Sequence, residues 1–221
     1  WVGPGFDLAA VDPASTPGFR GDRHDGEEAL LEGAERLSEL QERLWAESRA
    51  GGTRSVLLVV QGMDTSGKGG IMRHVVGAVD PQGVNITAFK APTAEERAHD
   101  FLWRIRRALP GAGELGVFDR SHYEDVLIAR VLTLVPRTVW SRRYATINRF
   151  EAEVAKNTKI VKVMLHISRD EQKARLGERL ARPDKHWKFN PGDLDQRQHW
   201  DASQGAYKDA LTQYSTDATP R

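Results

Sequence analysis

A stretch of nine residues, 62–70, limits the folds that this chain can adopt. It reads Gly-Met-Asp-Thr-Ser-Gly-Lys-Gly-Gly, follows the apolar run 55–61, and precedes apolar residues at helical spacing. A strand, a glycine loop of the form G-x-x-x-x-G-K and a helix, in this order, are typical of a phosphate-binding loop. The backbone N–H groups of such a loop surround phosphate oxygens, and the helix start adds partial positive charge. An ordinary glycine-rich turn is the alternative interpretation.

The residues of this loop have separate expected roles. Lys68 would reach a phosphate group as a point charge. The remaining candidate phosphate- and nucleotide-binding positions of the loop are Gly62, Met63, Thr65, Ser66, Gly67, Gly69 and Gly70. Gly69 stands where such loops usually carry the Ser or Thr whose hydroxyl holds Mg²⁺. If a metal ion binds here, another ligand must replace that hydroxyl, and Asp64 is the nearest candidate.

Length, charge and the absence of cysteine exclude several classes of protein. A chain of 221 residues favours one domain. The net charge of +1 argues against general attraction to nucleic acids or membrane surfaces, so an anion site must be a local cluster. Without cysteine there are no disulfides and no thiol catalysis, which fits a cytoplasmic protein. No apolar run reaches the ~18 residues of a membrane span.

The order of the predicted elements indicates an α/β fold. Residues 1–26, rich in Gly, Pro and Asp, are predicted to form an N-terminal arm, and residues 27–221 a single phosphate-loop kinase domain. Strands are expected at 55–61, 84–89, 115–118 and 159–167. Helices are expected at 27–49, 71–79, 93–109, 121–134, 138–156, 168–181 and 194–214, with capping boxes starting at Thr93, Ser121 and Ser168. Such alternation predicts a parallel sheet between helices, with ligands at the carboxyl ends of the strands.

Asp119 follows the predicted strand 115–118, where phosphate-loop enzymes place a second carboxylate near Mg²⁺. Asp64 and Asp119 together are therefore predicted to hold Mg²⁺, with Mn²⁺ as the alternative ion. A purely electrostatic role at a helix N-terminus is the competing interpretation of Asp119. Arg120 either faces the same phosphates or is a solvated surface residue. Lys90, after the second predicted strand, either reaches an acceptor phosphate or is exposed.

A basic segment, 169–188, follows the last predicted strand. Three of its arginines fall on one helix face at positions i, i+4 and i+7: Arg175, Arg179 and Arg182. A solvated face with salt bridges explains most of its basic residues. Nucleotide and nucleoside kinases, however, carry a mobile lid at this place, and lid arginines stabilise charge on the transferred phosphoryl group. Residues 169–190 are therefore predicted to form a lid.

Several motifs in a fixed order resemble the polyphosphate kinase 2 family. They are Gln-Gly-Met-Asp-Thr-Ser-Gly-Lys-Gly-Gly, Pro-Gln-Gly-Val, Phe-Lys-Ala-Pro, His-Asp-Phe-Leu-Trp-Arg, Phe-Asp-Arg-Ser-His-Tyr-Glu-Asp-Val-Leu, Glu-Gln-Lys-Ala-Arg and Lys-His-Trp-Lys-Phe-Asn-Pro-Gly-Asp, within residues 40–219. The resemblance implies a thymidylate-kinase-like phosphate-loop fold with a helical lid. It also implies reversible, Mg²⁺-dependent phosphoryl transfer between inorganic polyphosphate and nucleoside mono- or diphosphates.

The same resemblance implies roles for particular residues. The catalytic set that it implies is Asp64, Lys68, Asp119, Arg120 and Arg179. Lys90, Glu124, Arg130, Arg175 and Arg182 complete the expected phosphate- and nucleotide-binding positions. The form Ser-His-Tyr-Glu-Asp, which contains Glu124, resembles the branch that accepts both mono- and diphosphates. The family usually forms dimers or tetramers, and its members continue beyond the position at which this chain ends, Arg221.

Two other functions stay open. An ATP-dependent nucleotide kinase would have the same fold, and polyphosphate-dependent conversion of ADP to ATP without another donor would separate the two. A non-catalytic nucleotide-binding module would bind a nucleotide tightly without transfer. The predicted partners are polyphosphate, nucleotides and further copies of the chain, with neither nucleic acid nor a membrane.

Overall fold

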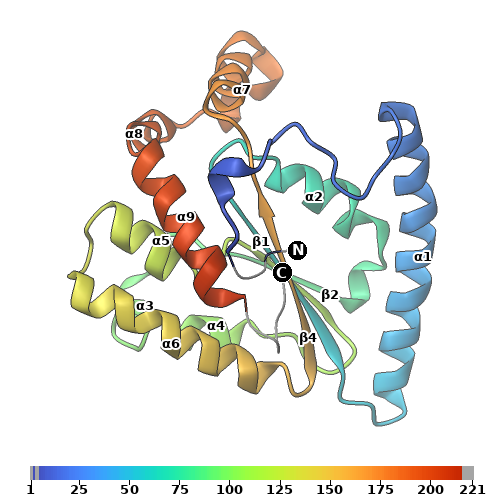
Figure 1. Cartoon of the computed structure of the whole chain (residues 1–221). Helices are drawn as coiled ribbons and strands as arrows, with labels where there is room; N and C mark the ends of the chain where they lie inside the picture. The colour runs from blue at the N-terminus through green and yellow to red at the C-terminus, as the bar shows by residue number, and fades with distance from the viewer. Residues whose placement is uncertain (1, 3–4, 216–221) are drawn as a thin grey trace.

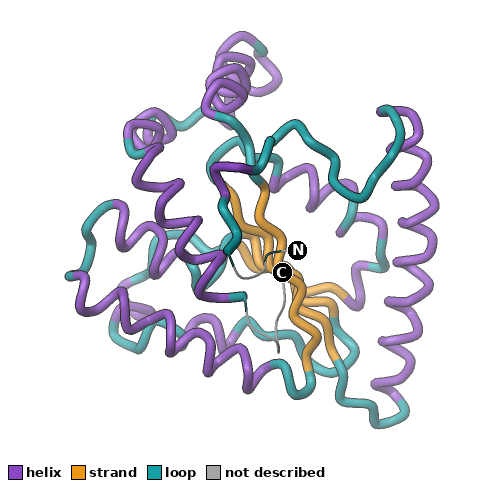
Figure 2. Tube along the Cα trace, viewed as in Figure 1, coloured by secondary structure: helices purple, strands orange, loops and turns teal. Residues whose placement is uncertain are grey.

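The computed structural model describes residue 2 and residues 5–215. Its centre is a parallel sheet with the strand order β2-β3-β1-β4, flanked by helices (Figures 1 and 2). The α/β prediction is therefore confirmed. Residues 1, 3, 4 and 216–221, which the predicted arm and kinase domain include, lie outside the described residues. Within the described residues, no helix is long and apolar enough to cross a membrane.

The elements have the following bounds. The strands are β1 (Ser55–Gly62), β2 (Val84–Ala88), β3 (Leu115–Asp119) and β4 (Thr158–Leu165). The α-helices are α1 (Arg23–Arg49), α2 (Lys68–His74), α3 (Ala94–Arg97), α4 (Trp103–Arg107), α5 (Glu124–Val131), α6 (Arg137–Val154), α7 (Arg169–Ala181), α8 (Gly192–Gln198) and α9 (Trp200–Tyr214). The short 3-10 helices are η1 (Leu8–Ala10), η2 (Val76–Ala78), η3 (Pro81–Gly83) and η4 (Pro183–Lys188).

Alternation along the central strand β1 decides which helices cover each face of the sheet. Leu57 and Val59 belong to a buried cluster with residues of α4, α5, α6 and α9. Val56 and Leu58 point the other way and contact a second cluster formed with α1, α2 and η2. Figure 1 shows these two groups of helices on opposite sides of the sheet. Because both faces are covered, β1 is apolar along most of its length, as expected for a parallel sheet.

The strand register brings distant residues to one edge. Val60 of β1 is paired with Asp119 of β3, and Gly62 pairs with Leu165 of β4. The backbone N–H of Arg120 donates to the Val60 carbonyl at 3.0 Å, so the pairing continues past Asp119. The phosphate loop, the Asp119–Arg120 pair and the start of α7 therefore meet at the carboxyl edge of the sheet.

A buried ion network anchors the segment after Asp119. Glu151 of α6 accepts hydrogen bonds from Tyr123 and from Lys162 of β4, and it lies 3.0 Å from His122 Nε2. Burial would raise the pKa of the Glu151 carboxyl, but the hydrogen bonds and charges of His122 and Lys162 lower it to about 2. The network ties the segment that follows Asp119 to both α6 and β4.

Glu151→Gln is expected to lower the free energy of unfolding at neutral pH by about 3 kcal/mol or more, because Lys162 stays buried after its counter-charge is removed. The pKa of Glu151 falls from 4.5 to about 2 on folding, so ionisation stabilises the fold above about pH 4.5. This stability is lost as the pH falls toward 2. Chemical denaturation would measure it, with the exposed Glu153→Gln as the control. Equal losses in both variants would contradict the prediction.

The first long helix begins earlier than residue 27, which the sequence predicted. Asp22 caps α1: its Oδ1 accepts from the N–H groups of His24 (2.7 Å) and Asp25 (3.2 Å). Asp25 Oδ2 in turn accepts from the Asp22 N–H at 2.8 Å. This capping box consists of two aspartates instead of the usual Ser or Thr with Glu. Helix α1 therefore begins at Arg23.

Two predicted helices are each divided in the structure. The segment 93–109 forms α3 and α4, because Asp100 Oδ1 accepts from the Leu102 N–H at 3.0 Å and competes with helical bonding. The segment 194–214 begins at Gly192 and forms α8 and α9. Its division lies at His199, whose N–H bonds to the Gln196 carbonyl in a tight turn.

The predicted capping box at Ser121 is wrong. Ser121 is buried, and its Oγ donates to Gln61 Oε1 at 3.3 Å and accepts from the Tyr123 N–H at 3.2 Å. Helix α5 begins only at Glu124, whose carboxylate accepts from the Gln61 amide instead of closing a box. A tertiary contact with β1 has therefore replaced the local cap.

The other two predicted caps differ in completeness. The Thr93 box is complete, because Thr93 Oγ1 accepts from the Glu96 N–H while the Glu96 carboxylate accepts from the Thr93 N–H. At α7, Ser168 Oγ accepts from the Glu171 N–H at 3.0 Å, but the Glu171 carboxylate binds Arg175 instead. Helix α7 thus starts where the sequence indicated, with only the Ser168 hydrogen bond of the predicted capping box.

Candidate functional site

The loop between β1 and α2 folds back sharply. At Gly62, an added Cβ would come within 2.9 Å of the Leu165 carbonyl oxygen, so the close approach of the two strands requires glycine. Gly67 has a φ of +107°, a conformation that L side chains rarely adopt. Thr65 also has a positive φ, 67°, which is uncommon for a β-branched residue. Strained non-glycine residues of this kind concentrate at functional sites.

Lys68 curls back over this loop. Its Nζ donates to the carbonyl oxygens of Gly62 at 2.7 Å and Met63 at 3.1 Å. Burial lowers the pKa of Lys68, and the positive charge of Arg120 acts in the same direction. Three carboxylates favour its charged form: Asp64, Asp119 and Glu124. The lysine therefore lies among three carboxylates, and its contact with a phosphate stays a prediction.

Two carboxylate oxygens at this edge fit the predicted metal ion. Asp64 Oδ1 accepts from Arg120 Nη2 at 2.6 Å, while Asp64 Oδ2 and Asp119 Oδ1 are buried without a hydrogen-bond partner among the described residues. Such oxygens suit Mg²⁺, which keeps several waters and is typically held by one or two carboxylates plus substrate phosphates. The described residues contain no group of three or more side chains that could hold a metal, so water and phosphate would complete the shell.

Hydroxyl groups of the loop add further acceptors and donors. Thr65 Oγ1 and Ser66 Oγ are buried and have no partner in the described part of the chain. Above the first turn of α2, an added Cβ at Gly69 or Gly70 would meet nothing within 4 Å. A serine or threonine at position 69 would therefore fit sterically. Steric crowding therefore does not explain why this loop carries glycine at position 69.

Arg120 and Glu124 lie beside the loop. Arg120 adopts a positive φ of 64° directly after β3, and its guanidinium bonds Asp64. Glu124 Oε1 accepts from Gln61 Nε2 at 2.8 Å. Burial raises the pKa of Glu124, whereas the charge of Arg120 and the hydrogen bond from Gln61 oppose this effect. The Gln61 amide of β1, Asp64 of the loop, Arg120 after β3 and Glu124 of α5 thus meet in one place.

Helix α7 rises from the carboxyl end of β4, and α7 and α8 lie above this edge of the sheet (Figure 1). Arg175 Nη1 donates to the Thr65 carbonyl at 2.8 Å and so contacts the loop directly. Arg179 Nη1 instead donates to Asp193 Oδ2 of α8 at 2.9 Å. Burial and the negative charge of Asp64 raise the pKa of Asp193, so the Arg179–Asp193 pair is within electrostatic range of the loop.

Three other predicted residues do not contact the loop. Arg182 is paired with Glu178 and Asp184 on the exposed side of α7. Lys90 is exposed, and its carbonyl oxygen accepts from the buried Arg104 at 2.8 Å. At the far end of α5, Arg130 pairs with Asp209 of α9 at 2.6 Å and covers the Trp140 ring. Their roles toward phosphate or nucleotide stay predictions.

Two buried glutamines at the site were missed by the sequence interpretation. Gln61, at the end of β1, organises Ser121 and Glu124. Gln172 of α7, 2% exposed, donates from Nε2 to the Asp64 carbonyl at 3.2 Å. A signal for Gln172 existed, because it stands one turn before the buried Leu176 and so occupies the face that helical spacing assigns to the core.

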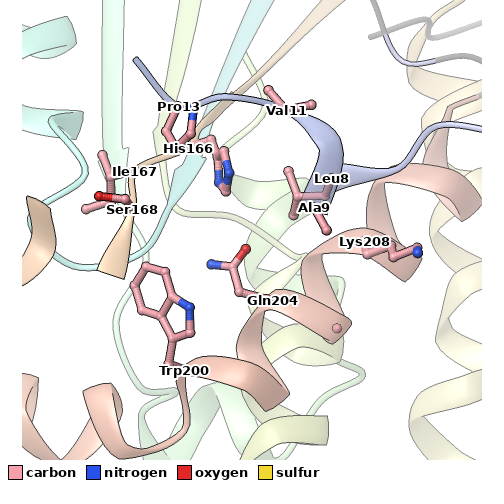
Figure 3. Close-up of a pocket in the computed structure, with 11 residues that line it drawn as sticks. Leu8, Ala9, Val11, Pro13, His166, Ile167, Ser168, Trp200, Gln204 and Lys208 are labelled. Carbon is pink, nitrogen blue, oxygen red and sulfur yellow. The ribbon is translucent and has the colours of Figure 1, made fainter. Parts of the chain in front are cut away.

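A cavity of about 410 Å³ lies next to the loop. It is lined by the N-terminal arm, the segment that follows β4 and the first half of α9, and none of the predicted site residues is part of its lining. Figure 3 shows His166, Trp200 and Gln204 around it. Gln204 Nε2 reaches Met63 Sδ at 3.3 Å, so α9 supports the loop from this side. The arm is docked here, with Leu8 buried in the core.

Comparisons with known proteins agree on one family. The family model described as polyphosphate kinase 2 matches residues 20–221. An AMP/ADP-polyphosphate phosphotransferase of Meiothermus ruber is 47% identical over 216 residues, covering 97% of this chain and 79% of the relative. An ADP-polyphosphate phosphotransferase of Rhodopseudomonas palustris is 41% identical over 221 residues, covering 94% of this chain and 75% of the relative.

A solved structure gives the same result. The crystal structure of polyphosphate kinase 2 from Arthrobacter aurescens TC1 superimposes with a TM-score of 0.97 at 56% sequence identity. The match covers 99% of this chain and 78% of the other. The similarity therefore extends over the loop, the sheet edge and helix α7 together.

Proposed function

The chain belongs to the polyphosphate kinase 2 family, and we propose that its phosphate loop transfers a phosphoryl group between inorganic polyphosphate and a nucleoside mono- or diphosphate. In the direction of ATP formation, a terminal phosphate oxygen of ADP attacks the end phosphorus of polyphosphate. A new P–O bond forms, the bridging P–O bond breaks, and the polyphosphate leaves one unit shorter. The chain is thus a polyphosphate:nucleotide phosphotransferase.

Four buried oxygen atoms carry this assignment. They belong to Asp64, Thr65, Ser66 and Asp119, and none has a hydrogen-bond partner among the described residues. Buried polar atoms are normally satisfied, so four exceptions on neighbouring residues of one sheet edge support a ligand site there. Lys68 and Arg120 stand beside them. A phosphoryl-transfer site needs carboxylate oxygens that hold a cation, and it needs fixed positive charges beside them.

Each of these residues has a definable task. The loop N–H groups and Lys68 bind and orient phosphate oxygens, and Arg120 neutralises equatorial charge on the phosphoryl group as it passes in line. Asp64 and Asp119 would hold Mg²⁺, which supplies positive charge that reduces repulsion between donor and acceptor phosphates. Asp119 also orients the attacking oxygen.

Helix α7 and the 3-10 helix η4 that follows it would act as the lid over this site. Arg179, held by Asp193, is the lid cation that would reach the transferred group, and Arg175 contacts the loop backbone. A closed lid excludes water, and fixed charges are more effective in a dry site. We assign the lid to residues 169–190, as the sequence predicted.

A donor–acceptor matrix tests the proposal. Polyphosphate or ATP is offered as donor to AMP, ADP, GMP and GDP, and products are separated by anion-exchange chromatography. We expect ATP from polyphosphate and ADP, and ADP from polyphosphate and AMP. Transfer from ATP alone would indicate a conventional nucleotide kinase, and binding without transfer would indicate a regulatory module. The AMP arm separately tests the two-acceptor branch that Glu124 suggested.

Four further parts of the proposal concern the setting of the enzyme. Mg²⁺ as the preferred ion would be tested by replacement with Mn²⁺ in the same assay. Assembly into dimers or tetramers would be measured by light scattering on the purified chain. The cytoplasmic location and the absence of a nucleic-acid partner stay predictions from composition and charge.

A further inference from the structure

Four consecutive carbonyl groups of the phosphate loop accept hydrogen bonds from side chains. Lys68 Nζ donates to the carbonyls of residues 62 and 63, at 2.7 and 3.1 Å. Gln172 Nε2 donates to the Asp64 carbonyl at 3.2 Å, and Arg175 Nη1 donates to the Thr65 carbonyl at 2.8 Å. Two of the three donors therefore come from helix α7, which is more than 100 residues away in sequence.

This arrangement fixes the polarity of the loop. A backbone loop binds anions only when its N–H groups point toward them, because successive N–H groups form the concave site. In a peptide unit the carbonyl points opposite to the N–H, so Gln172, which holds the Asp64 carbonyl, also fixes the direction of the Thr65 N–H. The strained φ of 67° at Thr65 shows that this conformation is not intrinsically preferred.

Gln172 is itself held in one orientation. Its amide is buried, and Oε1 accepts from Arg197 Nη1 of α8 at 3.1 Å. Arg197 is fixed in turn by the Arg169 carbonyl at 2.7 Å. Since guanidinium groups only donate, the oxygen of the amide must face Arg197, and its NH₂ group must face the loop.

We propose that Gln172 is a positioning residue, which holds the phosphate loop in its anion-binding conformation from the lid helix. The proposal deepens the function proposed above and rests on it. It also couples the lid helix to the loop. Arg197 of α8 orients the Gln172 amide, and this amide holds the Asp64 carbonyl. Phosphate-chain affinity then depends on a residue that touches no phosphate.

Gln172→Glu isolates this contact. The carboxylate still accepts from Arg197, so the link between α7 and α8 persists, but it cannot donate to the Asp64 carbonyl. We expect the dissociation constant for tripolyphosphate to rise about tenfold or more, the equivalent of one lost hydrogen bond. The melting temperature should stay close to that of the unchanged chain. Gln198→Glu, at an exposed glutamine of α8, is the matched control with unchanged affinity.

Gln172→Met separates positioning from simple packing. Methionine has a similar shape but loses both hydrogen bonds, so both variants should weaken tripolyphosphate binding if the loop contact matters. A carboxylate at position 172 also adds negative charge beside the loop, so the neutral Gln172→Met is the deciding variant. If Gln172 only joins α7 to α8, Gln172→Met would lose stability and still bind tripolyphosphate normally. Normal binding by Gln172→Met, or by Gln172→Glu, overturns the proposal.

Isothermal titration with both tripolyphosphate and ATP distinguishes this proposal from the proposed function. If the unchanged chain binds ATP but no tripolyphosphate, polyphosphate use is wrong, and the role of Gln172 is then measured with ATP. If the unchanged chain binds tripolyphosphate and the Gln172 variants bind it equally well, only the positioning role is wrong.

Discussion

Lys68→Ala is expected to reduce polyphosphate-dependent ATP formation by about a hundredfold or more, the usual effect of losing a charged contact to the transition state. The reason is twofold. Lys68 Nζ is the central cation among three carboxylates, and it also holds the carbonyls of Gly62 and Met63. Its loss removes charge stabilisation and loosens the loop, so turnover and phosphate affinity should both decrease.

A coupled luciferase assay with ADP and polyphosphate measures this effect. Lys156→Ala, at an exposed lysine in the turn after α6, is the control for the loss of one positive charge. Melting temperatures of both variants would show that folding is retained. Turnover by Lys68→Ala within threefold of the unchanged chain would disprove the proposed role of this lysine.

Asp119→Asn should also lower turnover by about a hundredfold or more, but with a different signature. The substitution keeps the shape of the side chain and removes one negative charge next to Lys68 and Arg120. The site becomes more positive, so tripolyphosphate binding should persist or tighten while the rate falls. The buried Asp119 Oδ1, without a partner among the described residues, is the atom whose charge is lost.

The Mg²⁺ dependence provides the second readout. Because Asp119 would share the ion with Asp64, the variant should need a higher Mg²⁺ concentration for half-maximal activity. Asp201→Asn, at an exposed aspartate in the first turn of α9, is the matched control. An Asp119→Asn enzyme with normal turnover and normal Mg²⁺ dependence would show that Asp119 only complements the helix that follows it.

The two signatures also separate the competing interpretations. Loss of Lys68 should lower both tripolyphosphate affinity and turnover, whereas loss of the Asp119 charge should lower turnover without weakening tripolyphosphate binding. A non-catalytic nucleotide-binding module would show the first effect on affinity and have no turnover to lose. Both variants therefore test the site at the level of individual charges.

Local chemistry explains what could be predicted. The glycines and Lys68 stand at the spacing of a phosphate-binding loop, and the apolar runs before and after them predict the strand and the helix that flank it. The end of β3 was recognisable from its apolar residues, which placed Asp119 and Arg120 at the carboxyl edge. Helix α7 was likewise found from its Ser168 cap and its end at residue 181.

Errors arose where a distant residue competed with a local pattern. The spacing of Ser121 and Glu124 predicts a helix cap, but the Ser121 hydroxyl donates to the side chain of Gln61, sixty residues away. The sequence also did not indicate that Arg175 contacts the backbone of the loop, at the Thr65 carbonyl. Helical spacing gives the face of an arginine but not its partner, because the partner depends on how α7 packs on the loop and α8.

The sequence by itself determined that this chain has a phosphate loop, a parallel sheet, and acids and bases at strand ends. These follow from periodicity and backbone conformation, which act over a few residues. Only the tertiary structure decided that the Asp64 peptide is held by Gln172 and that Glu124 turns toward Gln61. Strand register and helix packing determine such contacts. Burial of a polar group costs free energy unless it is hydrogen-bonded, so each buried group pairs with a partner that the packing places within hydrogen-bond distance.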